Sequence, residues 1–212
     1  MKKRICVALL LLCAAAALIA PQFSLDAGAS YIVEEDDAIK VFIGSTNGYS
    51  ESATSAYCIE QSELMDDFEN SSATYKALVT FSDFVDDEYA DNILGSASQI
   101  DKVYIWTPNE TGRAIIKVFN NDILDSIQDY FENIDVDSID DQNLASILSE
   151  LPDNYGVFAV EVEATHEVLS SLELADNVQV DIIQSPSAMQ RANDSGKEIQ
   201  YICVPEKPDG TS

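Results

Sequence analysis

Residue types that carry most enzyme catalysis are scarce in this chain. It has one histidine, His166, and four cysteines, of which Cys6 and Cys13 lie in an apolar N-terminal run. No G-x-S-x-G, H-E-x-x-H, C-x-x-C, P-loop or G-x-G-x-x-G pattern follows that run. Nucleophilic side chains need an adjacent base, and zinc needs several His or Cys ligands. The sequence therefore predicts no catalytic residue, and it predicts that His166 starts a helix at the surface.

Carboxylates, by contrast, are abundant, and one cluster suits a cation. Asp135, Asp137, Asp140 and Asp141 gather between two predicted helices. An EF-hand loop that began at Asp135 would need an oxygen ligand at its fifth position and a glycine at its sixth. The chain has Ile139 and Asp140 there. A calcium site of another kind is one interpretation, and helix capping with solvated neighbours is the other; no other cofactor is expected.

A third candidate site is the stretch VYIWTPNETGRAIIKV, from Val103 to Val118. It holds the sole tryptophan, Trp106, and one of eleven basic residues, Arg113. Pro108 and Gly112 predict a turn, so the stretch is expected to form a hairpin. Trp and Arg are enriched at binding hot spots. The two interpretations are a plain hairpin and a hairpin whose tip is a contact surface.

The N-terminus predicts export. A basic start, MKKR, precedes an apolar run and a small-residue stretch, which is the order of a secretory signal peptide, with cleavage expected after Ala29. An uncleaved membrane anchor and lipidation at Cys13 are the alternatives. We expect a secreted or cell-surface protein with no membrane insertion after cleavage, and the short basic start favours a bacterial one.

The charge of the exported chain limits its partners. Without residues 1–29 the chain keeps 8 basic and 37 acidic residues, a net charge of −29. Nucleic acid and anionic membranes would be repelled, whereas cationic peptides and basic protein surfaces are allowed. Solubility is the simpler explanation of the charge. The sequence does not indicate an oligomeric state.

Removal of the signal leaves a pair of cysteines, Cys58 and Cys203. An even pair in an exported protein predicts a disulfide, which would tie the first part of the domain to its tail. The alternative is a pair of buried thiols that pack as small hydrophobes.

Hydrophobic periodicity predicts an α+β fold with a mainly antiparallel sheet and helices on one face. The signal at residues 1–29 is followed by N-terminal strands and a polar loop at 30–75, a core at 76–186, and a tail with one strand-like segment at 187–212. Core strands are expected at 76–84, 100–108, 112–119, 156–165 and 177–186, and core helices at 85–98, 121–134, 140–154 and 166–175.

Two stretches of the core repeat the order strand, helix, strand. They are Lys76–Pro108 and Gly156–Pro186. Duplicated units of this kind build split β-α-β sheets, so we expect a ferredoxin-like β-α-β-β-α-β core with the return strand 112–119 as its third strand. The stretch Lys76–Pro108 resembles strand–helix–strand units in extracellular domains of bacterial proteins and of membrane-bound sigma regulators. That resemblance rests on pattern, and it assigns no functional residue.

Two functional hypotheses follow. The first is an exported, non-catalytic domain that binds a protein, peptide or cell-surface ligand, because export and a mixed core are combined with no catalytic set. The second is a small secreted hydrolase that uses a pair of carboxylates on carbohydrate. The first is favoured, because an acidic chain supplies carboxylate pairs by chance and has a single Trp for a sugar cleft.

Overall fold

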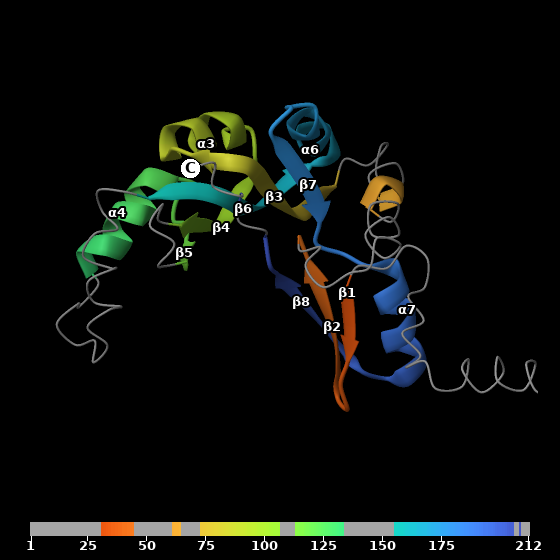
Figure 1. Ribbon diagram of the computed structural model, residues 1–212. Coiled ribbons are helices and arrows are strands. Elements are labelled where there is room, and N and C mark those ends of the chain that lie inside the picture. The colour runs from red at the N-terminus through yellow and green to blue at the C-terminus, as the bar shows by residue number, and fades with distance from the viewer. Residues whose placement is uncertain are drawn as a thin grey trace, which may run out of the picture.

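The chain folds into two sheets with helices packed on them, an α+β architecture (Figure 1). The computed structural model describes residues 31–44, 61–64, 73–106, 113–133, 155–205 and 208. The small sheet has the spatial order β1 (Tyr31–Glu34), β2 (Ala38–Ile43), β8 (Glu198–Cys203). The large sheet has the order β5 (Arg113–Lys117), β4 (Gln99–Trp106), β6 (Gly156–Thr165), β3 (Thr74–Val85), β7 (Val178–Ile182).

All neighbouring strands of the large sheet are antiparallel. Helix α3 (Asp87–Leu94) connects β3 to β4, helix α4 (Ile123–Asn133) follows β5, and helix α6 (His166–Glu173) connects β6 to β7. These elements follow the predicted order, and the predicted helix at 140–154 lies outside the described residues. The return strand predicted as the third strand of the core is β5, which forms an edge of the sheet; β6 lies between β3 and β4.

One face of the large sheet packs on the helices. Alternate residues of each strand point to this face, as the period of a strand requires. The helices supply apolar residues at helical spacing. This core contains Ala77, Val79, Phe81, Val103, Ile105, Val160 and Val162 from the strands, and Ala90, Leu94, Ile123, Ile127, Leu169 and Leu172 from the helices.

Local sequence sets where α3 and α6 begin. The side chain of Asp86 accepts a hydrogen bond from the Tyr89 backbone N–H, and that of Thr165 accepts one from Val168. Asp87 and Glu88 occupy the first turn of α3. Such caps satisfy N–H groups that a helix cannot pair internally, and acids in the first turn suit its positive end.

The opposite face of the large sheet shares a second apolar cluster with the small sheet. Ile39, Val41 and Ile43 of β2 belong to this cluster together with Leu78, Tyr104 and Phe158 of the large sheet. The rings of Tyr104 and Phe158 lie edge to face, with centroids 6.1 Å apart. The cluster covers part of this face. The polar side chains at neighbouring positions of the strands lie outside the cluster.

The chain after β7 adds a helix that the sequence analysis missed. Helix α7 (Pro186–Ser195) begins after the cap Ser185, with proline in its first turn, and ends at Gly196, whose φ is 69°. Its buried residues Ala188 and Ala192 join the second cluster. The strand-like segment of the tail is β8, which pairs parallel with β2.

Candidate binding site

Trp106 and Arg113 stand directly opposite each other at the end of the β4–β5 hairpin. Trp106 is partly buried against the second cluster, which fits its position at the rim of the core. The connecting residues 107–112 lie outside the described part of the chain. The contact surface at the hairpin tip therefore stays a prediction. The structure establishes the pairing of its two flanking residues, Trp106 and Arg113.

The hairpin leads to a strand edge. Of the described strands, only β4 pairs with β5, so the other side of β5 carries no partner among them. Ile115 is 50% exposed, and Lys117 is exposed with its ammonium 5.7 Å from the ring centroid of Phe119. Lys117 makes no ion pair within the described residues.

The direction of the β5 backbone groups follows from one hydrogen bond. The Val118 N–H donates to the Asp101 carbonyl at 3.0 Å, so these residues form a hydrogen-bonded pair. In an antiparallel ladder such pairs alternate with non-bonded ones. Ile116 and Ala114 then bond inward to β4, and Arg113, Ile115 and Lys117 direct their N–H and C=O groups to the outside.

At the other edge of the large sheet, a side chain covers one residue of β7. Ile182 of β7 donates its N–H to Gln61 Oε1 at 2.8 Å, and its carbonyl accepts from Gln61 Nε2 at 3.5 Å. Gln61 is itself buried, with 6% of its surface exposed. A side-chain amide thus satisfies the backbone groups that a partner strand would use at this position.

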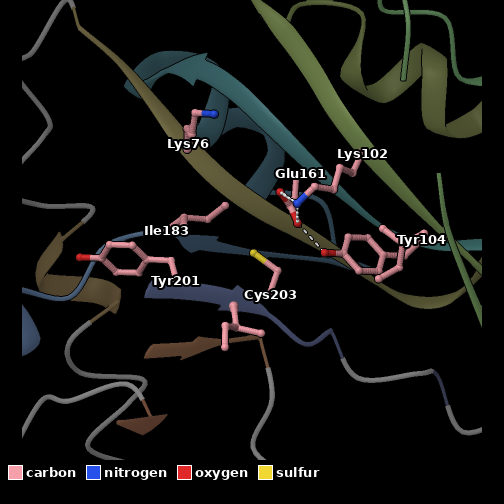
Figure 2. Close-up of a pocket in the computed structure, with 9 residues that line it drawn as sticks. Lys76, Lys102, Tyr104, Glu161, Ile183, Tyr201 and Cys203 are labelled. Carbon is pink, nitrogen blue, oxygen red and sulfur yellow. Dashed lines mark hydrogen bonds and ion pairs between the residues drawn. The ribbon is translucent and has the colours of Figure 1, made fainter. Parts of the chain in front are cut away.

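Next to β5, a groove of about 310 Å³ lies between the large sheet and β8. Figure 2 shows side chains of both sheets converging on it. It is lined by Lys76, Lys102, Tyr104, Ile115, Glu161, Ile183, Tyr201, Ile202 and Cys203. Since Ile115 lines the groove and also lies on β5, the groove and the open edge are neighbouring surfaces.

A buried carboxylate, Glu161, forms the centre of the groove. It is 8% exposed and lies on β6, the central strand. The Lys102 ammonium donates to both carboxylate oxygens, at 3.0 and 2.9 Å, and the Tyr104 hydroxyl donates to Oε1 (Figure 2). A buried charge is costly unless it is paired in this way.

Cys203 faces the same carboxylate from β8. Burial raises the pKa of the Cys203 thiol, and the charge of Glu161 and its hydrogen bond with the thiol raise it further. The thiol is thus protonated at neutral pH, and a protonated thiol is a poor nucleophile. Cys203 is a free cysteine in the structure. Its expected partner Cys58 lies outside the described residues, so the disulfide stays a prediction.

The other candidate residues divide into those outside and those inside the described ranges. Asp135, Asp137, Asp140 and Asp141 lie outside them, and the calcium site stays a prediction. Within the described ranges, no group of three or more His, Cys, Asp or Glu could hold a metal ion, and no helix is long and apolar enough to cross a membrane.

His166 starts α6, as expected. Its Nε2 lies 3.0 Å from the hydroxyl of Ser170, which stands four residues further along the same helix. A contact between residues at this spacing is local to one helix face. His166 is not among the residues that line the groove.

The groove residues Glu161, Lys102 and Tyr104 were not predicted from the sequence. A signal for one of them was present: GVFAVEVEAT places Glu161 and Glu163 inside an otherwise apolar strand. A charged residue in the middle of a central strand must find a partner on a neighbouring strand. The sequence does not say which strand that is.

The chain matches no family model, no curated protein and no solved structure.

Proposed function

We propose that this protein is an exported, non-catalytic binding domain that captures an extended peptide segment of another protein as an added strand on β5. The observation that carries the proposal is the edge of β5 with which no described strand pairs, where the backbone groups of Arg113, the half-exposed Ile115 and Lys117 face outward. Main-chain hydrogen bonds to such an edge supply affinity, and alternate side chains supply specificity.

The contrast between the two edges of the large sheet supports this site. Gln61 pairs with the backbone N–H and C=O of Ile182 on β7, whereas no described element pairs with the outer side of β5. Proteins commonly block strand edges, because open edges associate with other strands. An edge next to a groove, with no partner among the described strands, therefore supports a ligand site here.

A second copy of the chain is a poorer occupant than a peptide of another protein. Two β5 strands would bring Arg113 and Lys117 of one copy near the same residues of the other, and like charges opposite each other destabilise a strand pair. A net charge of −29 adds repulsion between copies at longer range. A partner protein with a net positive charge gains from that same long-range field, which matches the ligand class expected from composition, while its residues opposite Arg113 and Lys117 should be neutral or acidic.

The fold we propose for this domain is a ferredoxin-like core with an insertion. The elements β3, α3, β4, β6, α6 and β7 have the β-α-β-β-α-β order, and the spatial order β4-β6-β3-β7 places β6 within the first split unit. Strand β5 and helix α4 are then an insertion between β4 and β6. In this proposal the ligand-binding edge belongs to the insertion.

The carbohydrate hydrolase is the weaker candidate. Glycosidases use a pair of carboxyl groups beside the scissile bond. Glu161 is the one carboxylate among the described residues that line the groove, and Lys102 and Tyr104 already engage it. We expect no turnover of glycan substrates above a heat-inactivated control.

The test selects strand-length peptides from a phage-displayed random library on the protein purified after export of the full chain. Lys117→Pro removes an outward N–H, and proline is tolerated on an edge strand at a position where the N–H faces solvent. Lys117→Gln is the matched control, because it keeps the N–H and removes the charge. Circular dichroism melting checks that both variants fold.

We expect the selected peptides to bind the Gln variant nearly as well as the wild type and the Pro variant about tenfold more weakly, since one backbone hydrogen bond and the local fit of the strand are lost. Backbone amides of β5 should also exchange hydrogen more slowly with peptide bound. Equal binding to the Pro and Gln variants would place the ligand elsewhere and overturn the proposal.

A further inference from the structure

We propose that the groove between the two sheets binds an alkylammonium or guanidinium group at Glu161, as carried by a lysine or arginine side chain of a ligand. Three observations carry the inference: the groove, the buried carboxylate of Glu161 in it, and the exposure of Lys102, which pairs with that carboxylate. In naming a side chain of the partner protein the inference rests on the proposed function; because a strand added to β5 lies three strand spacings, about 14 Å, from β6, this side chain comes from a part of the partner outside that strand. Its own test uses a small cation and needs no peptide.

The acceptor is fixed in place. Glu161 is 8% exposed and stands opposite Leu78 on β3 and Lys102 on β4, so its backbone is held on both sides. The Tyr104 hydroxyl donates to its Oε1, and Tyr104 is 2% exposed. A carboxylate held by buried neighbours loses little freedom when it binds a ligand, and such preorganisation favours affinity.

The present cation, by contrast, is exchangeable. The Lys102 side chain is 48% exposed, while that of Glu161 is 10% exposed, so the ammonium reaches the carboxylate from solvent. Exposed lysine side chains are flexible, and ordering them costs conformational entropy. Lys102 can therefore swing out when a ligand cation takes its place, and the charge of Glu161 stays compensated.

The rest of the groove fits the stem of such a side chain. Ile115, Ile183 and Ile202 supply apolar surface, and Tyr104 and Tyr201 supply aromatic side chains to the lining of the groove. Lysine and arginine combine a methylene stem with a charged head, and aromatic faces attract such cations. A volume of about 310 Å³ is enough for one side chain and is at the small end of ligand sites.

An anionic ligand fits less well. Lys76 at the mouth of the groove is paired with Asp101 at 2.9 Å, and Lys102 is paired with Glu161. Both lysines are thus neutralised by local carboxylates, and the net charge of the exported chain enriches cations near its surface. Cys203, whose thiol is protonated, adds no charge to the wall of the groove.

The test removes the internal cation and supplies one from solution. Lys102→Met leaves Glu161 without its charge partner, which lowers the melting temperature. We expect n-butylammonium chloride at millimolar concentration to raise that melting temperature and to bind at least about tenfold more tightly than to the wild type, where it competes with Lys102. Sodium chloride at equal ionic strength should not reproduce the rise.

Further variants separate the groove from general salt effects. The double variant Lys102→Met/Glu161→Gln has no carboxylate at this position and should show no specific rise. Lys76→Met is the matched control, since it removes a paired lysine at the mouth and leaves the Lys102–Glu161 pair in place. An equal response of single and double variants, or equal responses to the sodium and butylammonium salts, would contradict the inference.

A measurement on the wild type covers the case in which Lys102→Met does not fold. Butylammonium titration should shift the backbone amide resonances of Lys102 and Glu161 saturably, and Glu161→Gln should abolish those shifts. Shifts that persist in the Gln variant, or none in the wild type, would refute the groove site. Because this probe does not pair with β5, its failure leaves the strand proposal standing, and failure of the Lys117→Pro test leaves the groove standing.

Discussion

At the scale of single residues, two asparagines shape the chain between β5 and α4. Asn120 and Asn121 have φ values of 57° and 58°, in the left-handed region. Asparagine tolerates this region better than most residues. The Asn121 side chain also accepts from the Ile100 N–H at 2.9 Å and donates to the Ser98 carbonyl at 3.3 Å. It thereby satisfies the backbone at the start of β4.

These contacts predict unequal effects at adjacent positions. Asn121→Ala should lower the free energy of unfolding by about 2 kcal/mol, because backbone strain is added and a part-buried N–H loses its acceptor. Asn120→Ala is the control, since within the described residues its side chain makes no such bond, and it should cost about 1 kcal/mol of strain. Urea unfolding measures both, and equal losses would contradict the role of the Asn121 side chain.

At the scale of elements, α3 helps to start α4. The Asp122 side chain accepts from the Asp125 N–H at 2.8 Å, as a cap does, and Asp91 of α3 accepts from the Ile123 N–H at 3.3 Å. Burial raises the pKa of the Asp91 carboxyl, and nearby Asp122 adds to this, while the backbone N–H of Ile123 opposes it. The hydrogen bond from the Ile123 N–H to ionised Asp91 is therefore made at a cost in folding free energy.

A pH-dependent prediction follows for Asp91. Because its pKa is higher in the folded chain than in the unfolded one, the folded chain holds more proton between these two values, and stability falls as pH rises through that window. Asp91→Asn keeps the acceptor without the charge. It should match the wild type below both pKa values and be more stable at pH 7.

The control for this prediction is Asp91→Ala, which removes the acceptor and should be about 1 kcal/mol less stable than Asp91→Asn at either pH. Denaturant unfolding across the acidic range measures the difference between each variant and the wild type. A wild-type advantage over the Asn variant that grows with pH would show that the charge of Asp91 stabilises the fold.

At the scale of the whole molecule, the small sheet is fixed to the large one near Gly44. This residue follows β2, with a φ of 84°, and a Cβ built on it would lie 2.2 Å from Leu78 Cδ2. Leu78 is fully buried on β3, so it has little room to move. Close approach of the two sheets at this point thus needs a residue without a side chain.

Two glycines with a left-handed φ, Gly196 and Gly44, allow the energetic cost of backbone strain to be measured apart from that of a packing clash. Gly196→Ala should lower the free energy of unfolding by about 1 kcal/mol, because φ is 69° but nothing lies within 4 Å of the added Cβ. Gly44→Ala should cost about 3 kcal/mol, because the clash with Leu78 adds to the strain. Urea unfolding compares them, and equal costs would mean that the sheets are not closely packed there.

The sequence predicted the order and type of the core elements because the signals for these are local. Val, Thr and Phe content predicted β3, alternation predicted β4, helical spacing predicted α3 and α4, and Pro108 with Gly112 predicted the hairpin to β5. Helix α7 was missed because its apolar residues are few, although Ser185, Pro186 and Gly196 mark its ends. The charge and the expected export likewise depend on composition and on the N-terminal stretch alone.

The tertiary structure decided which strands are neighbours. A period of two assigns a side chain to a face of a sheet, but it does not choose the strand beside it. The structure placed β6 rather than β5 in the centre, which brought Glu161 next to Tyr104 and Lys102 on β4 and next to Cys203 on β8. These residues are far apart in the chain, so pairing and packing over long separations created the groove.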